Sequence, residues 1–381
     1  MAQGAASVSD YRALARARLP HFLFEYLDGG SYDEVTLARN IEDLQSVALR
    51  QRVLRDVSSI DLSVDLLGER WALPVGLGPV GLSGLYARRG EVQAASAAAA
   101  ANVPMILSTV SACPLREVAA SGAVPWYQLY FVKDRGFVAS MIQTAKEAGC
   151  GALVLTVDLA VPGSRYRDAR AAGGGLRRMV DLLARPGWLW DVGVNGRPHS
   201  LGNLEPVVGK RAPLSDFQAW IHANFDPSVS WKDVEWVKTQ WSGPLIIKGI
   251  LDPDDARAAI DSGANGLVVS NHGGRQLDGV MSSARALPRV ADVVAGSVPV
   301  LADGGVRSGL DVVRMLALGA DFVLLGRAWA YALAANGRAG VAHVLKLIDA
   351  EMRVAMALTG CTSISEIGKD TLDRSGDQAT F

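Results

Sequence analysis

The 381-residue sequence predicts an α/β protein folded as a (β/α)₈ barrel. From residue 73 onward, eight short apolar runs recur, and a polar or glycine-rich turn and then a helical pattern follow them. Continuous apolar runs of this length are typical of parallel strands covered on both faces. The alternative is an open doubly wound sheet, which usually has fewer strands and a GxGxxG turn after the first strand. That turn is absent from the sequence, so the barrel is favoured.

The expected strands can be placed directly on the apolar runs. In chain order they are residues 73–79, 104–109, 126–130, 152–158, 245–250, 266–271, 299–305 and 322–327. The segments between them are expected to be helices, for example 135–148 and 252–262. The second of these begins with Asp252 and Pro253, residues that helix N-termini favour.

The sequence before the first strand, residues 1–70, is expected to be mostly helical and to cover part of the barrel. Its first helix has an N-cap pattern at Ser9. Because barrels of this length commonly form one unit, we expect a single domain over residues 1–381, with the barrel itself at 73–360.

One connection is far longer than the others. About 85 residues separate Asp158 from Leu245, which exceeds any ordinary strand-to-helix loop. The inserted region, 159–244, is therefore expected to be a lid or an interaction surface. Within it, residues 165–211 carry nine basic and four acidic residues, a balance of +5, whereas the whole chain has a net charge of −1.

Composition narrows the class of protein. The chain is 49% hydrophobic and 20% charged, as expected of a soluble globular protein with a large core. Its net charge of −1 argues against nucleic acid as a partner. The three cysteines are far apart in sequence, which indicates a reducing compartment without disulfides and gives no metal motif. The sequence shows neither a signal peptide nor an apolar run long enough to cross a membrane.

Polar residues follow seven of the eight expected strands, at the end of a barrel where active sites lie. "DGGVRSG" (303–309) and "LLGR" (324–327) combine glycines and arginines at the last two strand ends, where barrels commonly hold a phosphate. The alternative is two ordinary tight turns with solvated arginines. Ser108, Gln128 and Thr156 have donors and acceptors that suit a flat heterocycle.

Two further strand ends carry charged or titratable residues. Lys248 lies in a buried strand, so it requires an anion: either a reduced flavin or, alternatively, a neighbouring carboxylate. His272 and Arg275 stand in "SNHGGRQLD" (270–278), directly after an apolar run. We interpret His272 as a catalytic base and Arg275 as a carboxylate clamp. A lone histidine is more often structural, but this one lies in a polar, glycine-containing strand end.

Several long motifs resemble those of the FMN-dependent L-2-hydroxy acid dehydrogenases and oxidases. They are "WYQLY", "LVLTVD", "PGSRYRD", "IIKGI", "SNHGGRQLD" and "LADGGVRSG". The likeness runs from "VSDYRALARARLP" to "TSISEI", nearly the whole chain. Within the family, "YARRGEVQAA", "STVSACP", "WDVGVNGRPHSLGN" and "NFDPSVSWKD" are most similar to the bacterial respiratory L-lactate dehydrogenases.

The resemblance implies roles for individual residues. His272 matches the active-site base, and Asp158 would pair with its imidazole and stabilise the imidazolium. The implied substrate-binding residues are Tyr26, Tyr130, Arg165 and Arg275. Two guanidinium forks suit a carboxylate, which each can bind with two hydrogen bonds. Tyr26 depends on the resemblance, because its place in the leading segment would otherwise indicate a core residue.

The resemblance also implies FMN as the cofactor. The residues expected to hold the flavin are Pro79, Val80, Gly81, Ser108, Gln128, Thr156, Lys248 and Ser270. Those expected to hold its phosphate are Asp303, Gly304, Gly305, Arg307, Gly326 and Arg327. Lys248 would stabilise the negative charge of the reduced flavin.

The implied reaction is oxidation of an L-2-hydroxy acid, with L-lactate favoured, and transfer of electrons to a membrane quinone. The basic, tryptophan-bearing insertion would contact an anionic membrane surface on its cytoplasmic side, and the family suggests a symmetric homo-oligomer. An oxidase or a mandelate dehydrogenase with the same site is the alternative. A flavin-dependent isomerase should lack the set Arg165, His272 and Arg275, and a yellow protein that L-lactate bleaches without oxygen would exclude a non-enzymatic barrel. The sequence leaves open the side chain of the acid and the order in which C2 loses its proton and electrons.

Overall fold

A computed structural model describes residues 4–171, 175–197, 199–209, 220 and 223–373. Eight parallel strands form one sheet in the order β3-β10-β9-β8-β7-β6-β5-β4. They are β3 (Val75–Leu77), β4 (Ile106–Leu107), β5 (Trp126–Leu129), β6 (Leu153–Thr156), β7 (Leu245–Ile250), β8 (Gly266–Val269), β9 (Val300–Ala302) and β10 (Phe322–Leu325). A parallel bridge between Leu77 and Met105 joins the two outermost strands, so the sheet closes on itself. The predicted (β/α)₈ barrel is confirmed.

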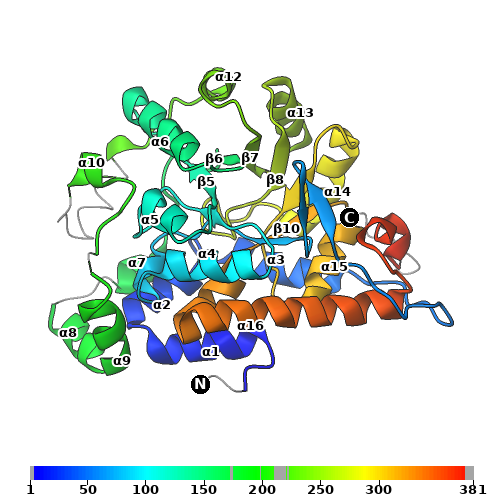
Figure 1. Ribbon diagram of the computed structural model, residues 1–381, viewed down its shortest axis with the longest axis horizontal. Coiled ribbons are helices and arrows are strands. Elements are labelled where there is room, and N and C mark those ends of the chain that lie inside the picture. The colour runs from blue at the N-terminus through cyan, green and yellow to red at the C-terminus, as the bar shows by residue number, and fades with distance from the viewer. Residues whose placement is uncertain (1–3, 172–174, 198, 210–219, 221–222, 374–381) are drawn as a thin grey trace.

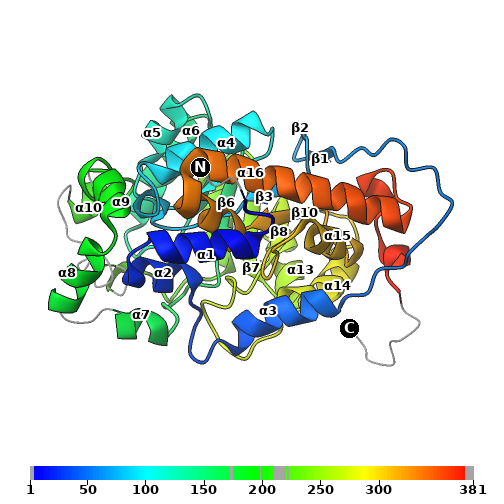
Figure 2. The same cartoon turned by 90° about the horizontal axis from the view of Figure 1, so that it is seen from below.

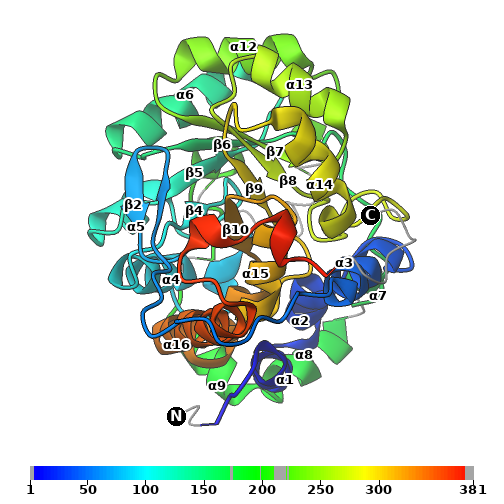
Figure 3. The ribbon, with the colours of Figure 1, turned by 90° about the vertical axis from the view of Figure 1, so that its right-hand side faces the viewer.

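Helices surround the strands (Figure 3). They are α4 (Gly90–Ala100), α5 (Leu115–Ala120), α6 (Arg135–Glu147), α12 (Trp231–Gln240), α13 (Pro253–Asp261), α14 (Ser283–Val294), α15 (Gly309–Ala317) and α16 (Arg327–Thr359). N-cap side chains determine where several of these helices begin. Asp134 and Asp252 cap α6 and α13, because each side chain accepts a hydrogen bond from a backbone N–H in the first turn.

The inside of the barrel explains where the polar strand-end residues lie. Its apolar layer includes Trp126, Val154, Ile246 and Val268. Side chains two residues apart on a strand share a face. The next inward position is therefore occupied by Gln128, Thr156 and Lys248 on three of these strands and by Ser270 directly after the fourth. These buried polar side chains form a layer above the apolar one, at the carboxyl ends of the strands.

A short hairpin, which the sequence did not predict, lies against the other end of the barrel. It consists of β1 (Val64–Leu66) and β2 (Glu69–Trp71), paired antiparallel. Leu66 belongs to the same apolar cluster as the barrel interior. The Trp71 ring packs edge-on against Trp126, with 6.2 Å between ring centroids. The hairpin therefore covers the end of the barrel at which the strands begin.

The leading segment forms α1 (Val8–Arg18), α2 (His21–Asp28) and α3 (Val35–Ser46). Helix α1 lies along α16, as Figure 1 and Figure 2 both show. The N-cap of α1 is Ser7 and not Ser9, and its Oγ accepts a hydrogen bond from Asp10 N at 3.3 Å. Helix α16 bends at Asn336 and Gly337, where the backbone leaves helical geometry.

The first part of the insertion projects at one end of the molecule, at the left in Figure 1. Its elements before α12 are α7 (Tyr166–Ala171), α8 (Gly175–Leu183), α9 (Pro186–Trp188), the π-helical η2 (Leu189–Val194) and α10 (Glu205–Val208). The short 3-10 helices η1 (Ser83–Leu85), η3 (Ile364–Glu366) and η4 (Lys369–Thr371) lie elsewhere. Lys210 and Arg211, two of the nine basic residues counted in the insertion, lie outside the described residues. Within the described part of the chain, every helix is too short or too polar to cross a membrane.

Candidate active site

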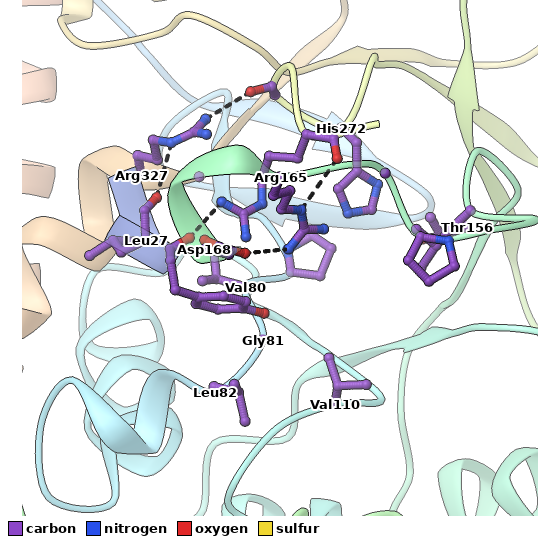
Figure 4. Close-up of a pocket in the computed structure, with 18 of the residues that line it drawn as sticks. Leu27, Val80, Gly81, Leu82, Val110, Thr156, Arg165, Asp168, His272 and Arg327 are labelled. Atoms are coloured by element: carbon purple, nitrogen blue, oxygen red, sulfur yellow. Dashed lines mark hydrogen bonds and ion pairs between the residues drawn. The ribbon is translucent and has the colours of Figure 1, made fainter. Parts of the chain in front are cut away.

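A cavity of about 810 Å³ opens at the carboxyl ends of the barrel strands. Strand-end residues form its floor, while α2 and the start of the insertion contribute its walls. Figure 4 shows Arg165, Asp168 and His272 on one side of this space, across from Leu82 and Val110. One side of the cavity is therefore charged and titratable, and the other is apolar.

The predicted base and its carboxylate partner are in contact. His272 Nδ1 lies 2.8 Å from Asp158 Oδ1. Burial alone would raise the pKa of Asp158, but His272 and Lys248 together outweigh it and hold that pKa below its usual range. His272 N also donates to Ser270 Oγ at 3.0 Å, which fixes the turn. Because Asp158 occupies Nδ1, Nε2 is the ring nitrogen left to face a substrate.

Two guanidiniums and a tyrosine, predicted to bind the substrate carboxylate, line one side of the cavity. Arg275 Nη1 donates to the carbonyl oxygens of Tyr26 and Gly29, at 2.6 and 2.8 Å. The Cζ atoms of Arg275 and Arg165 lie 4.9 and 5.8 Å from the centroid of the Tyr26 ring. Burial and the neighbouring Arg275 lower the pKa of Arg165. An anion that enters between the two guanidiniums would therefore stabilise both positive charges.

Two more cavity residues complete this side. Tyr130 is buried, which raises its pKa, and its ring lies 5.3 Å from that of Phe225. Asp168, which the sequence did not single out, lies 3.7 Å from Arg165 Nη1 through its Oδ2. Burial raises the pKa of Asp168, and its Oδ1 has no hydrogen-bond partner among the described residues. The sequence signals for it were its place at the end of the motif "PGSRYRD" and its position three residues after Arg165.

The polar layer above the barrel core fits the flavin ring. Gln128 Oε1 accepts from Ser108 Oγ at 3.1 Å and from Thr109 N at 3.2 Å. Gln128 Nε2 and Thr156 Oγ1 are buried and without a partner in the described structure. Buried polar atoms of this kind are rare because leaving them unbonded is unfavourable. A heterocycle with acceptors and donors along its edge would satisfy both.

Lys248 has a carboxylate partner and also lines the cavity. Its Nζ donates to Ser270 Oγ at 2.7 Å and lies 2.9 Å from Asp303 Oδ2, so the expected alternative of a carboxylate partner is present. Burial alone would lower the pKa of Lys248, but Asp303 and Asp158 outweigh it and raise that pKa. The side chain is therefore a protonated ammonium that lines the cavity, with one of its three donors left for a ligand.

The opposite end of the cavity fits a phosphate. Gly304 and Gly305 have φ angles of +99° and +85°, and a Cβ on Gly305 would lie 2.0 Å from Asn40 O. Only glycine allows this backbone path. Helix α16 starts here from Gly326 without a side-chain cap, and an uncapped helix N-terminus attracts anions.

Arg327 lines the cavity, and its guanidinium also has partners within the protein. Its guanidinium donates to the carbonyl oxygens of Leu27, Gly29 and Gly273 at 3.1, 2.7 and 2.9 Å. Burial lowers the pKa of Arg327 to about 9. The side chain thus braces α2 and the turn after His272, and its contact with a phosphate stays a prediction.

The structure divides the predicted site residues into two groups. Those that line the cavity are Tyr26, Pro79, Val80, Gly81, Tyr130, Thr156, Arg165, Lys248, His272, Arg275, Asp303, Gly304, Gly305, Arg307, Gly326 and Arg327. Those that lie behind this lining are Ser108, Gln128, Asp158 and Ser270. Each of the second group is hydrogen-bonded to another predicted site residue.

This fold and this cavity are typical of barrel enzymes that bind a phosphate-bearing cofactor. Residues 15–374 match the FMN-dependent dehydrogenase family. The chain belongs to that family, and the predicted family and FMN cofactor are confirmed.

Individual relatives agree with the family match. The chain is 61% identical to an L-lactate dehydrogenase of Xanthomonas oryzae pv. oryzae, over 97% of this chain and 96% of that protein. It is 60% identical to an L-lactate dehydrogenase of Ectopseudomonas mendocina, over 96% and 97% of the two chains. Among solved structures, the monotopic membrane protein (S)-mandelate dehydrogenase is 36% identical, with a TM-score of 0.92 over 97% of this chain and all of that one. A mandelate oxidase is 37% identical, with a TM-score of 0.84 over 97% and 98%.

Proposed function

We propose that this protein oxidises an L-2-hydroxy acid, L-lactate, to the 2-oxo acid and passes the electrons to a membrane quinone. The observation that carries the proposal is the arrangement within one cavity of the His272–Asp158 pair and the guanidiniums of Arg165 and Arg275. An imidazole close to two cations suits a substrate that has a removable proton next to a carboxylate.

Arg165 and Arg275 bind the substrate carboxylate, and Tyr26 and Tyr130 contact its oxygens. This orientation presents the substrate hydroxyl to His272 Nε2, which accepts a proton. The charge of Asp158 stabilises the imidazolium that forms. Bound FMN supplies a two-electron acceptor, and Lys248 places a positive charge where negative charge would develop.

The test is anaerobic reduction of the flavin by a panel of L- and D-2-hydroxy acids. L-lactate is expected to bleach the yellow protein, whereas D-lactate is not. His272→Gln should keep its FMN but reduce it about 10²- to 10⁴-fold more slowly, the usual contribution of a general base. Reduction of that variant at a rate near wild type would contradict the role proposed for His272.

A mandelate dehydrogenase or oxidase activity is the second candidate, favoured by the likeness to solved proteins of those names. The same panel separates it from the first candidate. If L-mandelate reduces the flavin with a higher ratio of limiting rate to dissociation constant than L-lactate, mandelate is the substrate.

The quinone acceptor implies contact with a membrane, and the insertion offers a surface for it. Met179, Val180 and Leu183 of α8 are more than half exposed, as is Trp190 of η2. Exposed apolar side chains beside arginines are typical of segments that lie in the membrane interface. The solved relative described as a monotopic membrane protein supports this assignment. A cytoplasmic-side location and a symmetric homo-oligomer are also proposed, on the family resemblance alone.

A further inference from the structure

The two walls of the cavity that bind the carboxylate come from segments far apart in sequence. Tyr26 belongs to α2, and Arg165 directly precedes α7. The two helices lie side by side (Figure 1 and Figure 2). Helix α7 has only six residues, and none of its apolar side chains is buried. Apart from the edge-on contact of the Tyr166 and Tyr32 rings, whose centroids are 5.6 Å apart, apolar packing contributes little to its position, and a polar interaction must hold it against α2.

Arg167 supplies that interaction. Its Nε pairs with Glu25, its Nη2 donates to Asp28 Oδ2 at 2.9 Å, and its Nη1 lies 3.3 Å from Glu34 Oε1. One guanidinium thus joins α7 to three carboxylates at and after α2. The planar fork of arginine suits this use, because each nitrogen can meet a different acceptor in a fixed geometry.

The carboxylates are themselves held in place. Asp28 is buried, with 4% of its surface exposed, and it accepts hydrogen bonds from Arg12 Nε at 2.6 Å and from Tyr331 OH at 2.6 Å. Glu34 Oε1 also accepts from Gly30 N at 2.7 Å. Arg167 is therefore bound to a fixed framework that includes α1 and α16.

Arg165 and Arg167 are two residues apart, and side chains with this spacing point in different directions from a helical turn. Arg165 lines the cavity and Arg167 does not. The contacts of Arg167 thus determine where Arg165 stands without touching the substrate. The Arg165 guanidinium also has direct partners: Asp168 Oδ2 lies 3.7 Å from its Nη1, and its Nε donates to Arg275 O at 3.4 Å.

We propose that Arg167 is a positioning residue that clamps α7 onto α2 and so holds Arg165 and Tyr26 at the spacing a substrate carboxylate requires. The proposal rests on the function proposed above, because it assigns the clamped groups to the carboxylate of a 2-hydroxy acid. Loss of Arg167 leaves FMN-binding residues untouched and Asp28 still paired with Arg12 and Tyr331. The effect is therefore expected on substrate binding more than on cofactor content.

The experiment is rapid anaerobic reduction of the FMN-loaded holoenzyme by L-lactate, which separates the substrate dissociation constant from the limiting rate. Arg167→Met is expected to raise the dissociation constant about 10-fold or more, the size of one charge-assisted hydrogen bond. The limiting rate should change less than about threefold, since His272 and Asp158 remain in place. Arg167→Lys should recover only part of the loss, because an ammonium cannot reproduce the three-way fork.

Arg12→Met is the matched control, because Arg12 binds the same Asp28 from α1 and does not contact α7. It should lower the thermal midpoint but leave the lactate dissociation constant within about twofold of wild type. Equal increases in that constant for the two methionine variants would overturn the proposal, as would a wild-type value for Arg167→Met.

Glu25→Gln keeps the proposal testable if Arg167→Met does not fold. It removes one charged partner of Arg167 and leaves Asp28 intact, so a smaller increase in the lactate dissociation constant is expected. An unchanged constant in that variant counts against the clamp. Failure of the proposed function has a different signature, since wild-type flavin would then not be reduced by any 2-hydroxy acid.

Discussion

The turn that carries His272 shows how single residues set the geometry of the site. His272, Gly273 and Gly274 have φ angles of +58°, +64° and +73°, so three successive residues are left-handed. This conformation is uncommon for histidine and is found mainly where the surroundings enforce it. A Cβ on Gly274 would lie 2.6 Å from Leu37 N, so the turn packs directly on the start of α3. The glycines therefore allow a path that a side chain would block.

Gly274→Ala is expected to reduce both stability and activity. Left-handed backbone costs about 1–2 kcal/mol for alanine, and contact with Leu37 adds to that cost. Because Arg275 follows directly, its guanidinium should also shift. The thermal midpoint and the rate of flavin reduction by L-lactate measure the two effects. Gly279→Ala is the control, since Gly279 has a φ of +82° but open space around its Cβ. The Gly279→Ala variant should lose some stability and keep the wild-type rate of flavin reduction. Equal losses of that rate in the two variants would contradict this account.

Residue spacing predicted part of the site and could not predict the rest. Gln128, Thr156 and Lys248 follow apolar strand residues, so the two-residue period of a strand places them inside the barrel mouth. The contacts of Arg167 and Arg327 gave no such signal. Both guanidiniums bind groups of α2, and only the docking of α2 brings those groups near. For Arg167, a position on the short polar helix α7 would otherwise indicate a solvated surface.

At the scale of elements, the buried strands could be predicted from the sequence and the exposed strands could not. The barrel strands lie between helices and the barrel interior, so their residues form continuous apolar runs. The hairpin strands β1 and β2 have only three residues each, and Asp65, Glu69 and Arg70 are exposed. Nothing in that pattern distinguishes them from a loop. The long interval after β6 revealed the insertion, but length alone does not give the helices inside it.

The exposed face of α8 leads to a prediction about membrane contact. Met179→Ser, Val180→Ser and Leu183→Ser together should lower binding to anionic liposomes at least about tenfold, because each apolar side chain contributes on the order of 1 kcal/mol when partly buried in lipid. Co-flotation of the intact protein with vesicles measures the binding. Activity with a soluble electron acceptor should be retained, since these side chains are outside the cavity.

The matched control for this prediction lies on α16. Val354 and Leu358 are exposed to a similar extent, 60% and 55%, and belong to a different part of the surface. Val354→Ser with Leu358→Ser should leave flotation unchanged. If the wild type does not float, or if the α8 variant floats as well as the wild type, the proposed membrane face is wrong.

At the scale of the whole molecule, one buried carboxylate joins four helices. Asp28 ends α2 and accepts hydrogen bonds from Arg12 of α1, Arg167 of α7 and Tyr331 of α16. These helices come from the beginning, the insertion and the end of the chain. The leading segment is thus attached to the barrel by charge as well as by apolar packing, and the attachment point is on the same helix as Tyr26, which lines the cavity.

Acid stability should depend on this carboxylate. Burial alone would raise the pKa of Asp28, but the hydrogen bonds from Arg12, Tyr331 and Arg167 outweigh it and hold that pKa well below its usual range. The folded protein therefore binds this proton less readily than the unfolded chain, whose value is about 3.9. It follows that the stabilisation is fully present above the unfolded value and is lost as pH falls through the folded one.

The thermal midpoint of the FMN-loaded protein is accordingly expected to fall as pH is lowered below about 4. Asp28→Asn should lower that midpoint near neutral pH by on the order of 10 °C, because the guanidiniums around it lose their buried partner. It should also flatten the acid dependence, since the group that takes up the proton is gone. Asp65→Asn is the control: Asp65 is 73% exposed and solvent screens its pairing with Arg70, so both quantities should stay near wild type. If Asp28→Asn loses stability in acid in parallel with the wild type, another carboxylate sets the acid limit.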